Sequence, residues 1–249
     1  MGRLSNKIIL VTGGARGQGA AEAALCVAEG AIVYIGDMLD DEGERLATQL
    51  AADKDRAIYH HLDVTDEGHW SSVVAAIEER HGRLDGLVNN AGILSSVSLE
   101  ATALSEWNRV MAVNLTGAFL GIKHCARLLG RARGSSVVNI GSLAGMTGVA
   151  NTVYAASKWG IRGLTKSAAM LLAGDGTRVN AVHPGLIDTP MIANDPVLKD
   201  AMAKKTPLQR LGQSEDIANL VLFLLSAEAS FLNGVDIEAD GGILNSLPF

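Results

Sequence analysis

The sequence predicts an α/β fold in which helices cover both faces of one parallel sheet. Short apolar, strand-like segments alternate with longer helix-like segments along the chain, as in βαβ units. Apolar residues make up 48% of the 249 residues and aromatic residues only 4%, so the core is built from small aliphatic side chains. Because no linker, repeat or low-complexity tract interrupts the alternation, we expect one doubly wound domain over residues 1–249.

Charge and cysteine usage exclude several classes of function. The net charge is −6 and no Lys/Arg-rich block is present, which argues against nucleic acid or an anionic membrane as a partner. Cys26 and Cys125 lie in helix-like apolar stretches, and neither they nor the six histidines have metal-ligand spacing. We therefore expect buried, reduced thiols and no metal. The first residues show no secretory signal pattern, so we expect a cytoplasmic protein.

The first strand, predicted over residues 7–11, runs into a glycine-rich turn and then an Ala-rich helix over 20–28. The turn has the pattern Gly13-x-x-x-Gly17-x-Gly19. Glycines let the backbone approach a pyrophosphate closely, and the amides at the start of the helix can bind its charge. This order of strand, turn and helix predicts a nucleotide site.

The second strand, predicted over residues 31–36, ends at Asp37. An acidic residue at this point can bind the ribose hydroxyls of the adenosine half of NAD and would repel the 2′-phosphate of NADP. Arg16, in the glycine turn, favours the opposite choice because it could attract a phosphate. Since the Asp37 carboxylate should lie nearer the 2′ position, we expect NAD.

Polar residues follow the third and fourth predicted strands. Asp63 could accept a hydrogen bond from the adenine amino group or serve the turn before the next helix, and the residues alone leave both roles open. The fourth strand ends at Asn89-Asn90-Ala91-Gly92, which suits a packed turn beside a ligand. In this part of the chain we predict helices over 41–50 and 67–80 and strands over 57–61 and 86–88.

The second half continues the alternation. We predict helices over 104–111, through Asn114, from Tyr154 to Ala173 and over 214–225, and strands over 136–140, 178–182 and 235–238. Residues 186–210 have no steady period and contain three prolines. Because this segment follows the carboxyl end of a strand, we expect a substrate lid there.

Tyr154 and Lys158 lie one helical turn apart, on the same face of the predicted helix. A neighbouring ammonium stabilises a phenolate, so we expect Lys158 to lower the pKa of Tyr154 toward working pH. Such a tyrosine can exchange a proton with an alcohol. Tyr-x-x-x-Lys alone is also an ordinary pattern of helix surfaces, and the surrounding motifs must decide between the two interpretations.

Six motifs, in order along nearly the whole chain, resemble those of the short-chain dehydrogenase/reductase family. The resemblance implies a single Rossmann-type domain with a seven-stranded parallel sheet, commonly a homotetramer, and hydride transfer between a nicotinamide and an alcohol or carbonyl. The motifs are Thr12-Gly13-Gly14-x-x-Gly17-x-Gly19, Asn89-Asn90-Ala91-Gly92, Asn114, Ser142, Tyr154-x-x-x-Lys158 and Pro184-Gly185.

The resemblance implies a role for each residue that matches a family motif. Tyr154 is the expected general acid/base, and Lys158 lowers its pKa and holds the nicotinamide ribose. Ser142 hydrogen-bonds the substrate oxygen, and Asn114, interrupting its helix, holds a water that links Lys158 to solvent. The implied cofactor contacts are Gly13, Arg16, Gly17, Gln18, Gly19, Asp37, Asp63, Val64, Asn90, Ala91, Gly92, Tyr154, Lys158, Pro184, Gly185, Ile187 and Thr189.

The sequence most resembles bacterial family members that act on ring alcohols and ketones, including hydroxysteroid and cyclic-alcohol dehydrogenases. No Arg or Lys is evidently reserved for a substrate carboxylate, so we expect a neutral, apolar secondary alcohol. The interval from Ser142 to Tyr154 is one residue shorter than the family pattern, which leaves the conformation of loop 145–153 open. Candidate pocket walls, each of which could instead be core or a subunit contact, are Leu94, Met146, Val149, Val153, Leu186, Met191 and Ile192.

Two other functions compete with this prediction. An NADPH-dependent 3-oxoacyl thioester reductase of the same fold is favoured by Arg16 and opposed by Asp37. A non-catalytic, nucleotide-sensing regulator is opposed by the complete set of Asn114, Ser142, Tyr154 and Lys158, because a sensor does not need an acid/base tyrosine.

Overall fold

The computed structural model of the protein describes residues 2–51, 56–95, 97–192 and 195–246. Its centre is a seven-stranded sheet in which every pair of neighbouring strands is parallel. The strands are β1 (Ile8–Thr12), β2 (Ile32–Asp37), β3 (Ala57–His61), β4 (Gly86–Asn89), β5 (Ser136–Ile140), β6 (Arg178–Pro184) and β7 (Asp236–Ala239). The α-helices are α1 (Gly17–Ala28), α2 (Asp40–Leu50), α3 (Glu67–His81), α4 (Leu104–Met111), α5 (Gly117–Gly130), α6 (Thr152–Leu172), α7 (Pro196–Lys204) and α8 (Ser214–Leu225).

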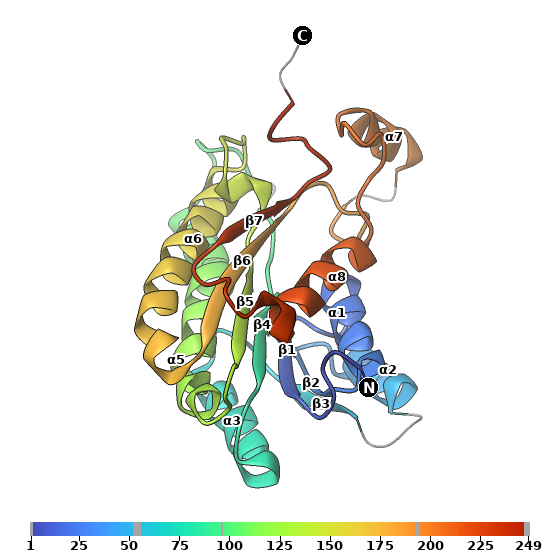
Figure 1. The fold of residues 1–249 in the computed structure, drawn as a ribbon. Helices are drawn as coiled ribbons and strands as arrows, with labels where there is room; N and C mark the ends of the chain where they lie inside the picture. The colour runs from blue at the N-terminus through green and yellow to red at the C-terminus, as the bar shows by residue number, and fades with distance from the viewer. Residues whose placement is uncertain (1, 52–55, 96, 193–194, 247–249) are drawn as a thin grey trace.

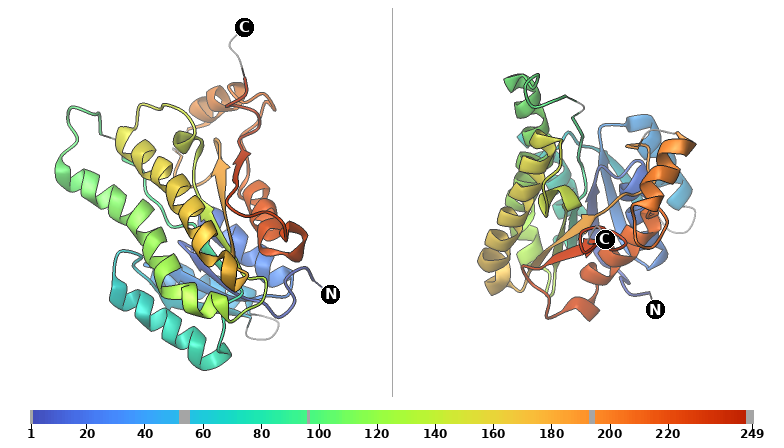
Figure 2. Two further views of the ribbon diagram at one scale, coloured as in Figure 1. Left: turned by 60° about the vertical axis from the view of Figure 1, so that its left-hand side comes forward. Right: turned by 90° about the horizontal axis from the view of Figure 1, so that it is seen from above.

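The strand order β3-β2-β1-β4-β5-β6-β7 confirms the predicted doubly wound sheet (Figure 1). Helices α1, α2 and α8 cover one face, and α3, α5 and α6 cover the other, as Figure 2 shows from above. The direction of winding reverses between β1 and β4. In such sheets a ligand binds at the carboxyl ends of the strands beside this reversal.

Both faces of the sheet are packed with aliphatic side chains, as the composition predicts. β1, β5 and β6 are buried along their full length. One apolar cluster lies between the sheet and α1 and α8, and a second, which includes the fully buried Trp70, lies beneath α3 and α5. Cys26 and Cys125 are free and buried in these clusters, which confirms the prediction of buried thiols. These two packed clusters hold the strands in place and so determine where their carboxyl ends lie.

The largest difference from the predicted elements is α7, inside the segment that was expected to be irregular. Asp195 begins this helix by accepting hydrogen bonds from the amides of Val197 and Leu198, at 2.9 and 3.4 Å. Pro196 occupies the first turn, where its missing N–H costs nothing. Pro196 therefore stands at the start of a helix rather than preventing one. Residues 193 and 194 of the predicted lid lie outside the described residues.

The other boundaries move by a few residues. α1 begins at Gly17 rather than Ala20, and β6 continues to Pro184. Within the described ranges, no helix is long and apolar enough to cross a membrane. The same ranges contain no group of three or more His, Cys, Asp or Glu side chains that could hold a metal ion.

Candidate active site

The turn between β1 and α1 has the geometry of an anion-binding loop. Gly13 and Gly17 adopt φ values of +62° and +58°, which side-chain-bearing residues rarely adopt. A Cβ on Gly19 would lie 2.2 Å from the Gly13 carbonyl oxygen, so only glycine lets the turn fold back on the helix. The N-cap residue of α1, Arg16, makes no side-chain cap, and the first turn contains no acidic residue. The first amides of α1 therefore suit a pyrophosphate.

Asp37 and Gln18 place polar atoms beside this turn. The Asp37 carboxylate accepts hydrogen bonds from the amides of Ala15, at 2.9 Å, and Met38, at 2.8 Å, which hold it against the glycine turn. The side-chain oxygen of Gln18 is buried without a hydrogen-bond partner. A ligand with hydroxyl and amide groups would satisfy such an atom, so the residues present fit a dinucleotide.

The Asn90-Ala91-Gly92 turn joins the ends of β1 and β4 at the reversal of the sheet. The Asn90 side-chain amide donates to the carbonyls of Thr12 and Gly13, both at 3.0 Å. The Thr12 hydroxyl accepts from the Ala91 amide at 3.1 Å. Gly92 brings this turn next to Lys158, because a Cβ placed on Gly92 would lie 3.5 Å from the Lys158 Nζ.

Asp63 and Val64 follow β3 at the far side of the glycine turn. One Asp63 carboxylate oxygen accepts from both the amide and the hydroxyl of Thr65, at 2.9 and 2.8 Å. Asp63 thus performs the turn role that the sequence left open beside the adenine role. Val64 is buried against Gly117 at the start of α5.

The segment after β6 reaches back to the glycine turn. Gly185 packs so closely that a Cβ would lie 2.6 Å from the Asp240 Cα, and Ile187 is buried. Thr189 and Pro190 lie closest to the open side of Gly17. A Cβ placed on Gly17 would be 3.9 Å from the Thr189 Cβ and 3.7 Å from the Pro190 Cδ. The structure therefore brings Pro184, Gly185, Ile187 and Thr189 to the same end of the sheet as the glycine turn.

Ser142, Tyr154 and Lys158 meet where β5 ends and α6 begins. The Ser142 side chain lies close enough to Tyr154 to lower its pKa, and the Ser142 hydroxyl oxygen accepts from the Ala144 amide at 3.1 Å. Lys158 lies one turn farther along α6, with its Nζ 5.6 Å from the centre of the Tyr154 ring. The Lys158 Nζ donates to the carbonyl of Ile140, the last residue of β5, at 2.8 Å. Two hydroxyls and an ammonium are therefore adjacent at the carboxyl end of the sheet.

The expected lowering of the Tyr154 pKa is wrong. Burial raises this pKa above its ordinary value, and the neighbouring Ser142 side chain offsets the rise only in part. Burial also lowers the pKa of Lys158 to about 8. The Lys158 ammonium is directed at the Ile140 carbonyl rather than at the phenol, which explains why spacing alone misjudged the direction.

Asn114 lies in a π-helical turn, η1 (Ala112–Thr116), that separates α4 from α5. This turn is the helix interruption that the resemblance implies, and such turns are frequent at functional sites. The Asn114 side chain is 2% exposed, and its oxygen accepts from the Ile93 amide at 2.8 Å. Its nitrogen donates to the Ile93 carbonyl at 3.0 Å and to the Ser157 hydroxyl at 3.1 Å. The Asn114 side chain thus joins the segment after β4, at Ile93, to α6 at Ser157, the residue before Lys158.

Asn151 supports the site, although none of the sequence motifs includes it. Its side-chain oxygen accepts from the Tyr154 amide at 3.2 Å, and its side-chain nitrogen donates to the Ser95 carbonyl. Asn151 therefore fixes the start of α6 and ties it to the segment after β4. An Asn just before a helical pattern is a recognisable N-cap signal, so its position could have been predicted.

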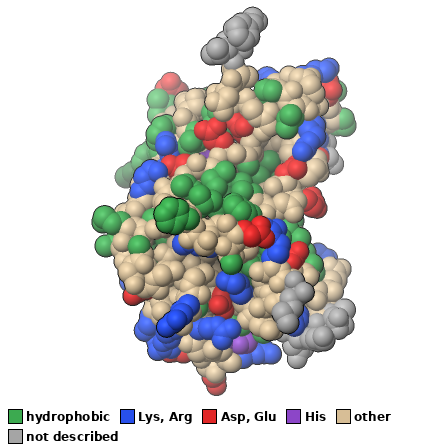
Figure 3. All heavy atoms as spheres, in the orientation of Figure 1, with side chains coloured by type: hydrophobic (Ala, Val, Ile, Leu, Met, Phe, Trp, Pro, Cys, Tyr) green, Lys and Arg blue, Asp and Glu red, His purple; other side chains and the backbone are tan. Residues whose placement is uncertain are grey.

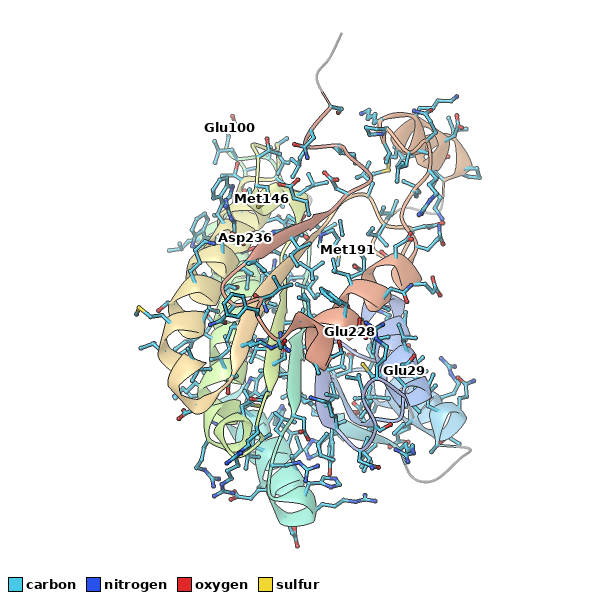
Figure 4. All side chains as sticks on the ribbon, in the orientation of Figure 1. Glu29, Glu100, Met146, Met191, Glu228 and Asp236 are labelled. Atoms are coloured by element: carbon cyan, nitrogen blue, oxygen red, sulfur yellow. The ribbon has the colours of Figure 1, made fainter. Side chains whose placement is uncertain are left out.

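The seven candidate pocket residues differ in exposure. Leu94 and Met191 are 39% and 49% exposed, whereas Val153 is 2% exposed and belongs to the core. Met146, Val149, Leu186 and Ile192 are partly buried. In Figure 4 Met146 lies on the α6 side of the sheet and Met191 on the α8 side. Apolar side chains thus lie on both sides of the carboxyl ends of the strands.

Comparison with known proteins identifies the family. A family model described as "Enoyl-(Acyl carrier protein) reductase" matches residues 13–244. The chain belongs to the short-chain dehydrogenase/reductase family. It is therefore an oxidoreductase that uses a nicotinamide cofactor. The match includes every segment of the site from the glycine turn to Thr189.

Three relatives of this short-chain dehydrogenase/reductase cover nearly all of its length. Trans-4-hydroxycyclohexanecarboxylate dehydrogenase of Sinomonas cyclohexanicum is 44% identical over 96% of this chain and 93% of the relative. The 3-alpha-(or 20-beta)-hydroxysteroid dehydrogenase of Mycobacterium tuberculosis is 45% identical over 99% and 92%. Cyclopentanol dehydrogenase of Comamonas testosteroni is 40% identical over 97% and 98%.

Proposed function

We propose that the protein interconverts an apolar, cyclic or steroidal secondary alcohol and its ketone, with NAD(H) as cofactor. The observation that carries the proposal is the placement of Ser142 next to Tyr154, with Lys158 beside them at the end of β5. A hydroxyl donor next to an acid/base tyrosine suits an alcohol oxygen. The reaction is an oxidation or reduction because the family uses a nicotinamide.

In the proposed oxidation, Tyr154 removes the proton from the substrate hydroxyl while Ser142 holds the same oxygen. The bound nicotinamide supplies the hydride acceptor for oxidation and the hydride donor for reduction. Lys158 would hold the cofactor ribose, and its ammonium, 5.6 Å from the centre of the Tyr154 ring, would support the tyrosinate through space rather than by a direct hydrogen bond. In reduction Tyr154 returns its proton to the oxygen as the carbonyl carbon receives the hydride. The side-chain amide of Asn114 is already hydrogen-bonded to Ile93 and Ser157. Asn114 would therefore use its main chain to hold the water that links Lys158 to solvent.

The preference for NAD rests on Asp37. Its carboxylate sits against the glycine turn, 2.9 Å from the Ala15 amide, where it can accept from the ribose hydroxyls. A 2′-phosphate there would meet a negative charge. Arg16 is exposed, and it remains the feature that favours NADP.

The proposed substrate class comes from the relatives and from the apolar residues near the site. The names of the three relatives each describe an alcohol of a ring compound: a hydroxycyclohexane, a hydroxysteroid and cyclopentanol. Leu94 and Met191 offer exposed apolar surface to such a ring. We propose that residues 186–210 cover the bound substrate as a lid, in which Lys199 of α7 pairs with Asp188 at 2.7 Å.

Association and location are also proposals. Hydrophobic side chains gather over β7 and α8 in the view of Figure 3. Phe231, in the turn between α8 and β7, is fully exposed. β7 is an edge strand, so this face could meet another copy, in keeping with the homotetramer that the family resemblance implies. The buried, free Cys26 and Cys125 support a cytoplasmic location.

The test is a panel of alcohols assayed by formation of NADH or NADPH. We expect oxidation of cyclopentanol, cyclohexanol or a hydroxysteroid with NAD, and slower oxidation of straight-chain primary alcohols. Reduction of a 3-oxoacyl thioester with NADPH, without oxidation of any ring alcohol, would instead support the alternative favoured by Arg16. No turnover with either cofactor across both substrate classes would contradict both proposals.

A further inference from the structure

His183, the residue before the Pro184-Gly185 turn, is fully buried and connects a cluster of three charged residues to the site. Its Nε2 lies 2.9 Å from the carboxylate of Asp236 on β7. Its Nδ1 faces the peptide of Ser142, 3.3 Å from the amide nitrogen and 3.1 Å from the carbonyl oxygen. Figure 4 shows Asp236 beside α6, from which Lys166 contacts it at 2.8 Å and Arg162 at 3.3 Å.

The hydrogen bonds around His183 select one tautomer. Burial would raise the pKa of Asp236, but hydrogen bonds from Lys166 and His183 outweigh burial and lower it, so the carboxylate is ionised. An ionised carboxylate only accepts, so the His183 Nε2 carries a proton. In a neutral imidazole Nδ1 is then an acceptor and takes the Ser142 N–H. The Ser142 carbonyl has a separate donor, because it accepts from the Gly145 amide at 2.8 Å. The Ser142 N–H is therefore the group that pairs with Nδ1.

Packing fixes the ring against the Ser142 peptide. A Cβ on Gly141 would lie 2.4 Å from the His183 Nδ1, so the ring occupies the space that a side chain would need. The Gly141 amide donates to the Val182 carbonyl at 2.7 Å, which joins the two strands next to the ring. The direction of the Ser142 hydroxyl depends on the backbone at this point.

We propose that His183 is a positioning residue that holds the Ser142 peptide, and hence the Ser142 hydroxyl, in the orientation that binds the substrate oxygen. Asp236 fixes the ring tautomer, and Lys166 keeps Asp236 charged. The inference rests on the proposed function, in which Ser142 contacts the substrate.

Two substitutions separate the contacts of His183. His183→Gln retains an amide N–H near Asp236 and withdraws the acceptor from Ser142. His183→Asn retains an acceptor near the Ser142 amide and loses the hydrogen bond to the Asp236 carboxylate. We expect His183→Gln to lower kcat/KM roughly 10-fold, the effect of one lost hydrogen bond, with an unchanged Kd for NADH. His183→Asn should stay within about 3-fold of wild type although its Tm falls. A purely structural role predicts that His183→Asn is the less active variant, and that result would overturn the proposal.

A double-mutant cycle with Ser142→Ala gives the second readout. If His183 acts through Ser142, His183→Gln should cost less than about 2-fold once the hydroxyl is gone. An undiminished 10-fold cost in the Ser142→Ala background would overturn the inference and leave the proposed function intact. Wild-type turnover by Ser142→Ala would instead remove Ser142 from the proposed function, and this inference with it. If His183→Gln fails to fold, Asp236→Asn serves in the same cycle, because its amide can donate to Nε2 and reverse the tautomer.

Discussion

Glu22 on α1 carries a stability effect whose size follows from the structure. Its side chain is 1% exposed, and both carboxylate oxygens are buried without a hydrogen-bond partner. Burial raises the pKa of Glu22 from 4.5 to about 8. The folded protein therefore keeps this carboxyl protonated at neutral pH, whereas the unfolded chain ionises it. Replacing Glu22 by Gln removes the titration and nearly preserves the volume.

The sign and size follow from proton linkage. Between about pH 4.5 and 8 the folded state binds one more proton than the unfolded state, so the free energy of unfolding decreases as pH rises. Each pH unit in this window costs at most about 1.4 kcal/mol, which makes about 3 kcal/mol from pH 5 to pH 7 an upper estimate. Glu22→Gln should escape this loss, and its advantage over wild type should grow with pH.

Urea unfolding of wild type and Glu22→Gln at pH 5, 6, 7 and 8 measures the effect. Glu44→Gln, an exposed position on α2, is the matched control and should show a difference from wild type that does not change with pH. A Glu22→Gln advantage of the same size at pH 5 and pH 8 would refute the argument.

Two further predictions concern the cofactor. Asp37→Ser should reduce kcat/KM for NAD roughly 10- to 100-fold, the effect of losing hydrogen bonds to a charged group, and should raise activity with NADP. Asp41→Ser, an exposed acid on α2, is its control, and equal losses in the two variants would count against the role of Asp37. Gly19→Ala should weaken NADH binding at least ~10-fold in a fluorescence titration, because its Cβ would lie 2.2 Å from the Gly13 oxygen. Gly163→Ala, whose Cβ meets nothing within 4 Å, should bind normally.

The sequence predicted the sheet and most helices because their signals are local. Buried parallel strands are short aliphatic runs, and glycine or polar residues mark where they end. The prediction failed at α7, because residues 186–210 show no steady helical period, whereas Asp195 caps a helix that starts at Pro196. In this segment the start of the helix depends on one capping side chain, Asp195, rather than on a periodic pattern of apolar residues.

The site shows the same division between local and long-range information. Spacing placed Tyr154 and Lys158 on one face of a helix, but the direction of the Tyr154 pKa depends on burial, which spacing does not encode. His183 and Asp236 come from different strands, and only the pairing of β6 with β7 brings them together. A single histidine in a sequence gives no sign of such a partner.

The turnover of Tyr154→Phe tests the central claim most directly, because it removes only the hydroxyl that is proposed to carry the proton. With NAD and a ring alcohol that wild type oxidises, we expect kcat to fall ~10²- to 10⁴-fold. The Kd for NADH should change less than about 3-fold, since removing one uncharged contact costs little binding free energy. Turnover within 10-fold of wild type, with cofactor binding intact, would contradict the assignment of Tyr154 as the acid/base.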